Sequence, residues 1–148
     1  MTIQHILVPV DFSRYAEQAL EYAIGLARKL SARLTLLHVL HLMPMGVVDG
    51  GTALPYSYIQ ELEAEVQQEM ETYRQRVQEA GLEGTVLVEH GIPFQSIVDT
   101  ARDQHVDLIV MGTQGRTGLA HLFLGSVAEK VVRLAPCPVL VTRGSAAQ

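Results

Sequence analysis

Short apolar runs alternate with stretches of helical periodicity along the whole chain, and no other feature constrains the fold as strongly. Each run is too short for a helix and rich in Val, Ile and Leu, as strands buried on both faces are. The predicted strands are Ile6–Val10, Leu34–Leu40, Thr85–Glu89, Asp107–Met111 and Pro138–Thr142. Strands that alternate with helices predict an α/β fold, in which helices cover both faces of a mostly parallel sheet.

Four stretches between these strands place apolar residues three or four positions apart, which predicts helices with one apolar face. The predicted helices are Ser13–Leu30, with Ser13 as N-cap, Ile59–Val77, Pro93–Ala101 and Ser126–Leu134. The pattern lapses from Leu42 to Tyr58, where glycines and prolines predict a long loop that acts as a lid, a binding loop or a mobile segment. Five glutamates between Ile59 and Val77 are interpreted as the solvated face of that helix.

The chain has 148 residues, which fits a single domain over residues 1–148. No uncharged apolar run approaches the roughly 20 residues that a bilayer span needs, so we expect no membrane span. The first residues, Met1 to His5, lack the basic and apolar regions of a signal peptide. Cys137 is the single cysteine, which fits a reducing compartment, and we therefore expect a cytoplasmic protein.

The charge balance argues against nucleic acid as a partner. Eleven Lys and Arg residues stand against sixteen Asp and Glu residues, for a net charge of −5, and only Lys29 and Lys130 are lysines. Binding to a nucleic-acid backbone depends on clustered positive charge that displaces counterions. A small anionic ligand is not excluded, because backbone N–H groups of a negatively charged protein can still hold a phosphate.

Four of the twelve glycines fall between Gly112 and Gly125, directly after a predicted strand. Glycine adopts positive φ freely and lets the backbone approach a ligand closely, so a glycine-rich turn can direct several N–H groups at a phosphate. The helix that follows adds the partial positive charge of its N-terminus. The segments Gly112–Gly118, which includes Arg116, and Gly125–Val127 therefore form a candidate anion cradle.

The same segment also fits a simpler structure, a flexible surface loop followed by a helix whose first turn Ser126 and Glu129 close as a capping box. It does not fit the two best-known phosphate loops. No lysine follows Gly118 or Gly125 as a Walker motif requires, and no glycine follows the first strand as a dinucleotide fingerprint requires.

The spacing Gly112-x2-Gly115-x9-Gly125-Ser126 resembles the ATP-binding signature of the universal stress protein A family. The resemblance extends over nearly the whole chain, through the segments Ile6–Ser13, His38–Val39, Gly91–Pro93, Asp107–Gly112 and Pro136–Val141. It implies a three-layer, Rossmann-like α/β sandwich of the adenine nucleotide α hydrolase-like type, with a five-stranded parallel sheet in the order 3-2-1-4-5. It also implies the ATP-binding branch of the family and a homodimer formed through the last strand.

In that strand order, Asp11 at the end of the first strand and Gly112 at the end of the fourth face each other across the crevice where the chain reverses direction. A carboxylate there can accept hydrogen bonds from ribose hydroxyls, and the resemblance implies this role for Asp11. Taken by itself, Asp11 also fits a cap-like residue ahead of the first helix, although Ser13 can supply that cap. The resemblance implies that Pro9, Val10 and Val39 surround the adenine. It implies phosphate contacts from Met111, Gly112, Thr113, Gly115, Arg116, Thr117, Gly118, Gly125, Ser126 and Val127.

A metal site and a catalytic nucleophile both lack support in the sequence. The six histidines form no His-x3-His pair, and the sequence assigns no His–Asp pair to Cys137. No pair of carboxylates is placed to bind a divalent ion at the phosphates. Mg²⁺ or Mn²⁺ would therefore accompany ATP, held mainly by the nucleotide and water. No catalytic residue is assigned.

These observations favour an ATP-binding module of stress response or regulation, in which occupancy changes the segment Leu42–Tyr58, the dimer or the surface for a regulatory protein partner. Two alternatives stay open: a slow ATPase or autophosphorylating enzyme that modifies Thr113 or Ser126, and a dimeric interaction module that works without nucleotide. For phosphoryl transfer, the sequence shows no well-placed general base. The dimer is also expected from the apolar edge strand Val139–Val141, which an isologous partner would cover.

Overall fold

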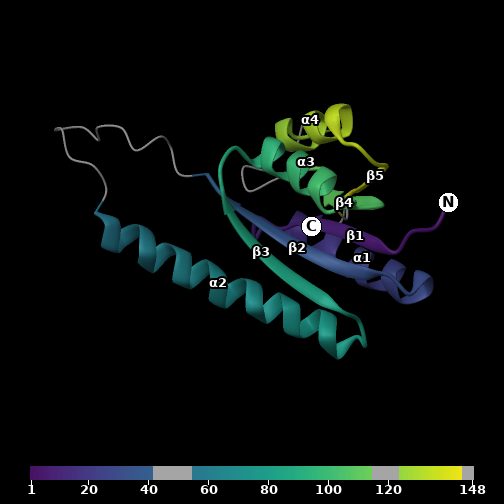
Figure 1. Ribbon diagram of the computed structural model, residues 1–148, viewed down its shortest axis with the longest axis horizontal. Helices are drawn as coiled ribbons and strands as arrows, with labels where there is room; N and C mark the ends of the chain where they lie inside the picture. Colours follow the sequence, from purple (N-terminus) through teal and green to yellow (C-terminus); the bar gives the residue numbers. More distant parts are fainter. Residues whose placement is uncertain (42–54, 115–123, 145–148) are drawn as a thin grey trace.

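The computed structural model describes residues 1–41, 55–114 and 124–144, and the structure below refers to these residues. Its elements are β1 (His5–Pro9), α1 (Arg14–Leu30), β2 (Arg33–Leu40), α2 (Tyr56–Glu79), β3 (Gly84–His90), α3 (Pro93–Asp103), β4 (Leu108–Gly112), α4 (Ser126–Leu134) and β5 (Val139–Thr142) (Figure 1). The predicted alternation of strands and helices is confirmed. None of the helices in this part of the chain is long and apolar enough to cross a membrane.

Helix α2 begins earlier than predicted. Its first residue is Tyr56, so it includes the last residues of the segment that was predicted as a loop, while residues 42–54 lie outside the described residues. Pro55 holds φ at −58°, close to the helical value, and its carbonyl accepts hydrogen bonds from the amides of Tyr58 and Ile59. Tyr56 and Tyr58 are exposed, so this first turn lacks the apolar periodicity that predicts a helix.

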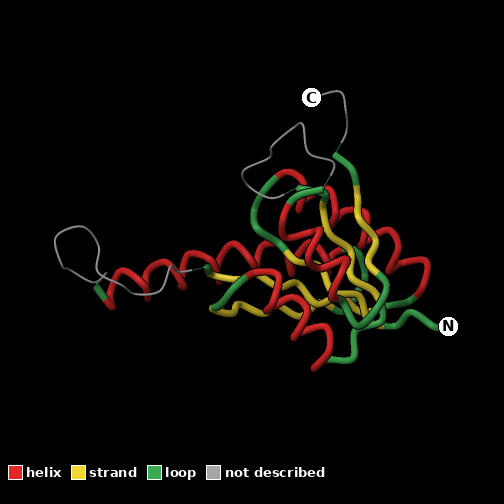
Figure 2. The backbone as a smooth tube through the Cα atoms, turned by 90° about the horizontal axis from the view of Figure 1, so that it is seen from above, coloured by secondary structure: helices red, strands yellow, loops and turns green. Residues whose placement is uncertain are grey.

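The strands form one parallel sheet in the order β3-β2-β1-β4-β5, as the resemblance implies. Helices α1 and α2 cover one face and α3 and α4 cover the other, which gives three layers (Figures 1 and 2). The predicted fold class is therefore confirmed. The chain winds from β1 outward to β2 and β3 and later from β4 outward to β5, so the winding reverses between the adjacent strands β1 and β4.

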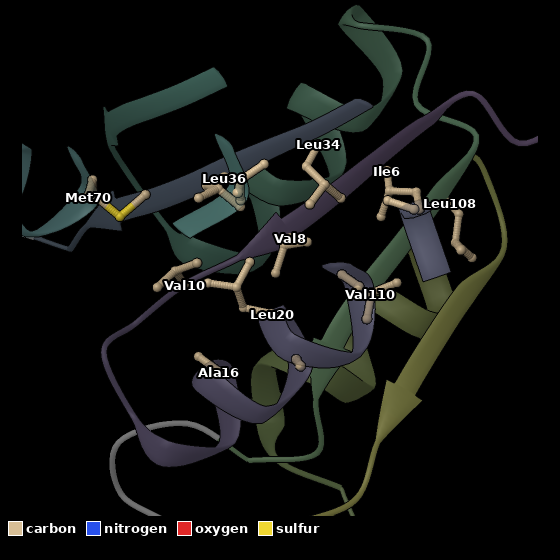
Figure 3. Close-up of a cluster of buried hydrophobic side chains, with 14 of the residues drawn as sticks. Ile6, Val8, Val10, Ala16, Leu20, Leu34, Leu36, Met70, Leu108 and Val110 are labelled. Atoms are coloured by element: carbon tan, nitrogen blue, oxygen red, sulfur yellow. The ribbon is translucent and has the colours of Figure 1, made fainter. Parts of the chain in front are cut away.

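The core consists of two apolar clusters, one on each face of the sheet. Successive side chains of a strand point to opposite faces. In β1, Ile6 and Val8 therefore point toward α1 (Figure 3), whereas Leu7 belongs to the cluster under α3 and α4. The buried face of α1 consists largely of small side chains, Ala16, Ala19, Ala23 and Ala27. Small side chains let this helix lie close to the sheet.

Strand β5 forms one edge of the sheet. On its inner side, the carbonyls of Pro138 and Thr142 accept hydrogen bonds from the amides of Ile109 and Thr113. The main-chain groups of successive residues point to opposite sides of a strand, so the N–H and C=O groups of Val139 and Val141 point to the outer side. No strand within the described residues pairs with that side.

Candidate functional site

A cavity of about 780 Å³ opens at the carboxyl ends of β1, β2 and β4, and residues of α2, α3 and α4 complete its walls. It lies where the winding of the sheet reverses, the position at which open α/β sheets bind ligands. The predicted site residues that the structure describes all line this cavity: Pro9, Val10, Asp11, Val39, Met111, Gly112, Thr113, Gly125, Ser126 and Val127. The remaining predicted site residues, Gly115, Arg116, Thr117 and Gly118, lie outside the described residues.

Asp11 combines the two roles that the sequence left open. Its Oδ1 accepts a hydrogen bond of 3.0 Å from the Ser13 amide, which helps to turn the chain into α1. The N-cap itself is Ser13, whose hydroxyl accepts from the Ala16 amide at 3.2 Å. One carboxylate oxygen of Asp11 is thus used to start the helix, and the other, Oδ2, has no hydrogen bond to the described residues.

The main chain of Val39 faces the cavity. The Val10 amide donates to the Leu37 carbonyl at 2.8 Å, and the Arg33 amide donates to Gln4, so the odd-numbered residues of β2 direct their main-chain groups toward β1. Strand β1 ends at Pro9, opposite Leu37, two residues before Val39. The N–H and C=O of Val39 therefore point past the end of β1 into the cavity.

The main chain of Val10, in contrast, is already paired inside the protein. Its amide bonds Leu37, and its carbonyl accepts from His38 Nδ1 at 2.6 Å. Of the residues predicted around an adenine, Val39 thus offers hydrogen-bonding groups, whereas Val10 and Pro9 offer apolar surface.

Helix α4 directs its N-terminus at the cavity. Its N-cap is Gly125, in an extended conformation with φ −66° and ψ 162° and without a side chain to cap the helix. Ser126 and Glu129 therefore do not form the capping box that the sequence allowed. Ser126 is the first helical residue, and the Glu129 carboxylate accepts a hydrogen bond of 2.9 Å from Arg133. The first hydrogen bond of the helix runs from the Glu129 amide to the Gly125 carbonyl, so the amides of residues 126 to 128 have no intrahelical partner.

Two amides that were predicted to bind phosphate, those of Thr113 and Gly125, instead donate hydrogen bonds within the protein. The Gly125 amide donates to the Thr113 carbonyl at 2.6 Å, and the Thr113 amide donates to Thr142 in β5 at 3.0 Å. These bonds join the end of β4 to the start of α4. The amides of Thr113 and Gly125 thus hold the two sides of the cavity together, and the amides of the first turn of α4 are donors not used in this way.

The packing of α1 against β4 requires glycine at position 112. A Cβ at this position would lie 2.9 Å from both Cβ and the carbonyl oxygen of Tyr15 in α1. Contacts that short do not occur in real structures, so α1 can lie this close to β4 only because residue 112 is glycine. The sequence placed Gly112 in the anion cradle and gave no sign of this contact, since Tyr15 lies far away along the chain.

Several lining residues were not among the predicted set: Phe12, Ala16, Leu37, His38, Leu40, His41, Leu62, Glu65, Val66, Glu69, Pro93, Ile97, Gln114 and Ala128. The most unusual is Phe12, which adopts φ 65°, a left-handed conformation that bulky residues rarely take. Its ring lies 4.6 Å from that of His38 and 5.9 Å from that of Tyr73 in α2. Burial, assisted by Glu17, raises the pKa of Tyr73 to about 12, so the phenol of this aromatic group stays neutral.

The described lining carries acidic side chains but no Lys or Arg. Asp11, Glu65 and Glu69 contribute carboxylates, and both glutamates are exposed at the wall formed by α2. The N-terminus of α4 contributes the partial positive charge of a helix end to this lining. Within residues 1–41, 55–114 and 124–144, no three His, Cys, Asp or Glu side chains are grouped so that they could hold a metal ion.

Comparison with known proteins gave consistent matches over nearly the full length. The profile of the universal stress protein family matches residues 2–143. Universal stress protein YxiE of Bacillus subtilis is 33% identical over 144 residues, covering 93% of this chain and 97% of that protein. The structure of protein MJ0577 of Methanocaldococcus jannaschii is similar with a TM-score of 0.87 and 31% identity, over 99% of this chain and 100% of that one. A universal stress protein from Archaeoglobus fulgidus, solved in complex with dAMP, has a TM-score of 0.67 and 27% identity, over 95% and 98% of the two chains.

Proposed function

The chain belongs to the universal stress protein family, and on that premise we propose that it binds an adenine nucleotide in the cavity between the ends of β1 and β4. One observation carries the proposal: a single cavity holds both the open main-chain groups of Val39 and the N-terminus of α4. Its volume of about 780 Å³ lies in the usual range for small-molecule sites. The dAMP complex of the Archaeoglobus fulgidus relative supports the same class of ligand.

The base fits the end of the cavity at Val39. Adenine presents an acceptor at N1 and a donor at its 6-amino group, and Val39 presents one N–H and one C=O on the same side of the strand. Val10 and Met111, both buried, supply apolar surface beside it. The Oδ2 of Asp11 is then the acceptor for a ribose hydroxyl.

The phosphates fit the opposite end, at α4. The amides of Ser126, Val127 and Ala128 supply donors and the positive end of the helix. Gly115, Arg116, Thr117 and Gly118 complete this part of the site in the sequence-based prediction. Mg²⁺ or Mn²⁺ would be held by the phosphates and water, because the described lining offers no cluster of ligands for it.

We propose that nucleotide occupancy regulates the protein in the cytoplasm. Helix α2 forms one wall of the cavity, and its first residues are the last residues of the segment Leu42–Tyr58 that was predicted to respond to the ligand. A nucleotide in the cavity would contact this wall and so change what the protein presents to a second copy or to a regulatory partner. The homodimer that we propose forms through the edge of β5, where the main-chain groups of Val139 and Val141 pair with no strand of the part of the chain that the structure describes.

Incubation of the purified protein with radiolabelled ATP and Mg²⁺, followed by analysis of the bound nucleotide and of the protein, tests the proposal. Retained, intact ATP is the expected result. ADP or a protein labelled at Thr113 or Ser126 would instead support the enzyme. If no nucleotide is retained, both are wrong and the dimeric interaction module without nucleotide is favoured.

The substitution Ser126→Pro tests the donors of α4 directly. Proline is well tolerated as the first helical residue, and Gly125 before it already has the extended ψ of 162° that proline requires. The variant should therefore fold normally but lose one amide donor to a charged phosphate. We expect ATP affinity to fall by about 10-fold to 100-fold, measured by calorimetry.

Ser126→Ala is the matched control for that substitution, because it removes the hydroxyl and keeps the amide. It should bind ATP nearly as the wild type does. Equal affinity of the wild type and a folded Ser126→Pro variant would show that the phosphates lie elsewhere.

A further inference from the structure

A buried histidine, His38, stands where the ladder between β1 and β2 stops. We infer that His38 is a positioning residue for the nucleotide base: by bonding the Val10 carbonyl, it keeps the Val39 amide from pairing with β1 and so keeps it open to the cavity. The inference rests on the adenine-nucleotide site proposed above, and it gives a role there to a side chain outside the predicted set.

The ladder geometry identifies the bond that is missing. In a parallel pair, a residue that donates to one residue of the partner strand accepts from the residue two positions further along that strand. The Val10 amide donates to the Leu37 carbonyl, so the next ladder bond would run from the Val39 amide to the Val10 carbonyl. The register of β1 with β2 ends at Pro9 opposite Leu37, and that bond is not formed.

The imidazole of His38 supplies the donor instead. Its Nδ1 lies 2.6 Å from the Val10 carbonyl oxygen, and because a carbonyl only accepts, Nδ1 carries the hydrogen. His38 is 8% exposed, and the Phe12 ring packs against it with centroids 4.6 Å apart. Phe12 itself is held at φ 65°, which turns the chain away from β2 directly after this bond.

Loss of this donor would change the backbone as well as the side chain. Val10 is 3% exposed, so its carbonyl would be left without a partner in a buried position. The next donor along the ladder is the Val39 amide. If the Val39 amide donates to the Val10 carbonyl, it can no longer donate to the base. The affinity for the base and the solvent exposure of the Val39 amide would then fall together.

Hydrogen exchange of the Val39 amide, measured by NMR together with the dissociation constant for ATP, tests the inference. In the ligand-free wild type, Val39 should exchange much faster than Leu37, whose amide lies within the ladder, and should become protected when ATP binds. His38→Leu should protect Val39 without ligand and weaken ATP binding by about tenfold or more. His38→Asn places an amide N–H near the position of Nδ1 and should keep ATP affinity within about threefold of the wild type.

His5→Leu is the matched control, because it removes another buried histidine from the far end of the same sheet and should change neither ATP affinity nor Val39 exchange. Slow exchange of Val39 in the ligand-free wild type overturns the inference, as does a loss of ATP affinity of about tenfold or more in a folded His38→Asn variant. These two measurements serve even if His38→Leu does not fold. A wild type that binds no adenine nucleotide overturns the proposed function and this role with it, whereas unchanged ATP affinity in folded His38→Leu overturns the role alone.

Discussion

At the scale of single residues, His5 makes the stability of the protein depend on pH. His5 is 3% exposed, with Nε2 2.7 Å from Thr35 Oγ1 and Nδ1 3.2 Å from Arg33 Nη2. A guanidinium only donates, so Nδ1 accepts and the hydrogen lies on Nε2. Burial and then the charge of Arg33 lower the pKa of His5, although the main chain of Gln104 and then the charges of Asp107 and Glu83 act in the opposite direction.

We expect the free energy of unfolding to fall as the pH drops below the ordinary histidine pKa of 6.5. Below that value the unfolded chain takes up a proton on His5, while the folded chain resists it until its own, lower pKa is reached. The stabilisation is thus complete above pH 6.5 and is lost toward lower pH. In urea denaturation, the wild type should lose up to about 1.4 kcal/mol per pH unit more than His5→Gln. Parallel pH curves for the two proteins would contradict this role.

The sequence predicted which residues end the strands more reliably than which of their groups are available to a ligand. Local composition marks the ends of strands, and together with the strand order that the family resemblance implies it predicted Asp11 and Gly112 at one crevice. The bonds of Val10 with His38 and of Thr113 with Gly125 join residues that are separated along the chain. No local pattern shows such bonds, and they decide which amides remain for a ligand.

At the scale of elements, the close packing of α1 on β4 depends on the glycine at position 112. In Gly112→Ala the new Cβ would meet Tyr15 backbone at 2.9 Å, and backbone cannot rotate aside. Either α1 or β4 must shift, and we expect a loss of about 1–3 kcal/mol of unfolding free energy in urea denaturation.

Gly25→Ala, in the middle of the same helix, is the control with the opposite sign. A Cβ there has nothing within 4 Å, so only the helix propensity changes. This variant should be more stable than the wild type by about 0.5–1 kcal/mol. Equal effects of the two substitutions would mean that the contact with Tyr15 does not limit the packing.

The elements themselves could be predicted because core-facing side chains repeat along them, and their ends were missed where that repeat is absent. Tyr56 and Tyr58 are exposed and carry no periodicity. Asp107 was predicted inside a strand, but its carboxylate accepts from the amides of Gln4 and His5, and β4 begins after it. Periodicity also shows which face of α2 is apolar but not which part of the sheet it covers, so its place in the cavity wall could not be predicted.

At the scale of the whole molecule, the order of the strands came from the resemblance to a family, since periodicity does not determine which strands are neighbours. That order leaves β5 at an edge with the amide of Val141 on its open side. Proline is tolerated on an edge strand where its missing N–H would face outward. Val141→Pro therefore removes a main-chain donor from the proposed dimer interface and leaves the pairing with β4 intact.

We expect the wild type to have the mass of a dimer in light scattering at micromolar concentration and Val141→Pro to have that of a monomer. The urea midpoint of the variant, measured at a concentration at which both proteins are monomeric, should stay close to that of the wild type. A monomeric wild type, or a variant that stays dimeric, would rule out the β5 edge as the interface.

The position of β4 and α4 in the chain also sets when the cavity comes into existence during synthesis. Strands β1, β2 and β3 are neighbours in the sheet and are all made by residue His90, so this half of the sheet can pair before β4 emerges from the ribosome. The first turn of α4 is the last part of the cavity wall to be made. A nascent chain thus has the main-chain edge at Val39 well before it has a place for phosphate. A ligand that needs both ends can stabilise only the completed molecule, so it acts on the finished fold and not on its early formation.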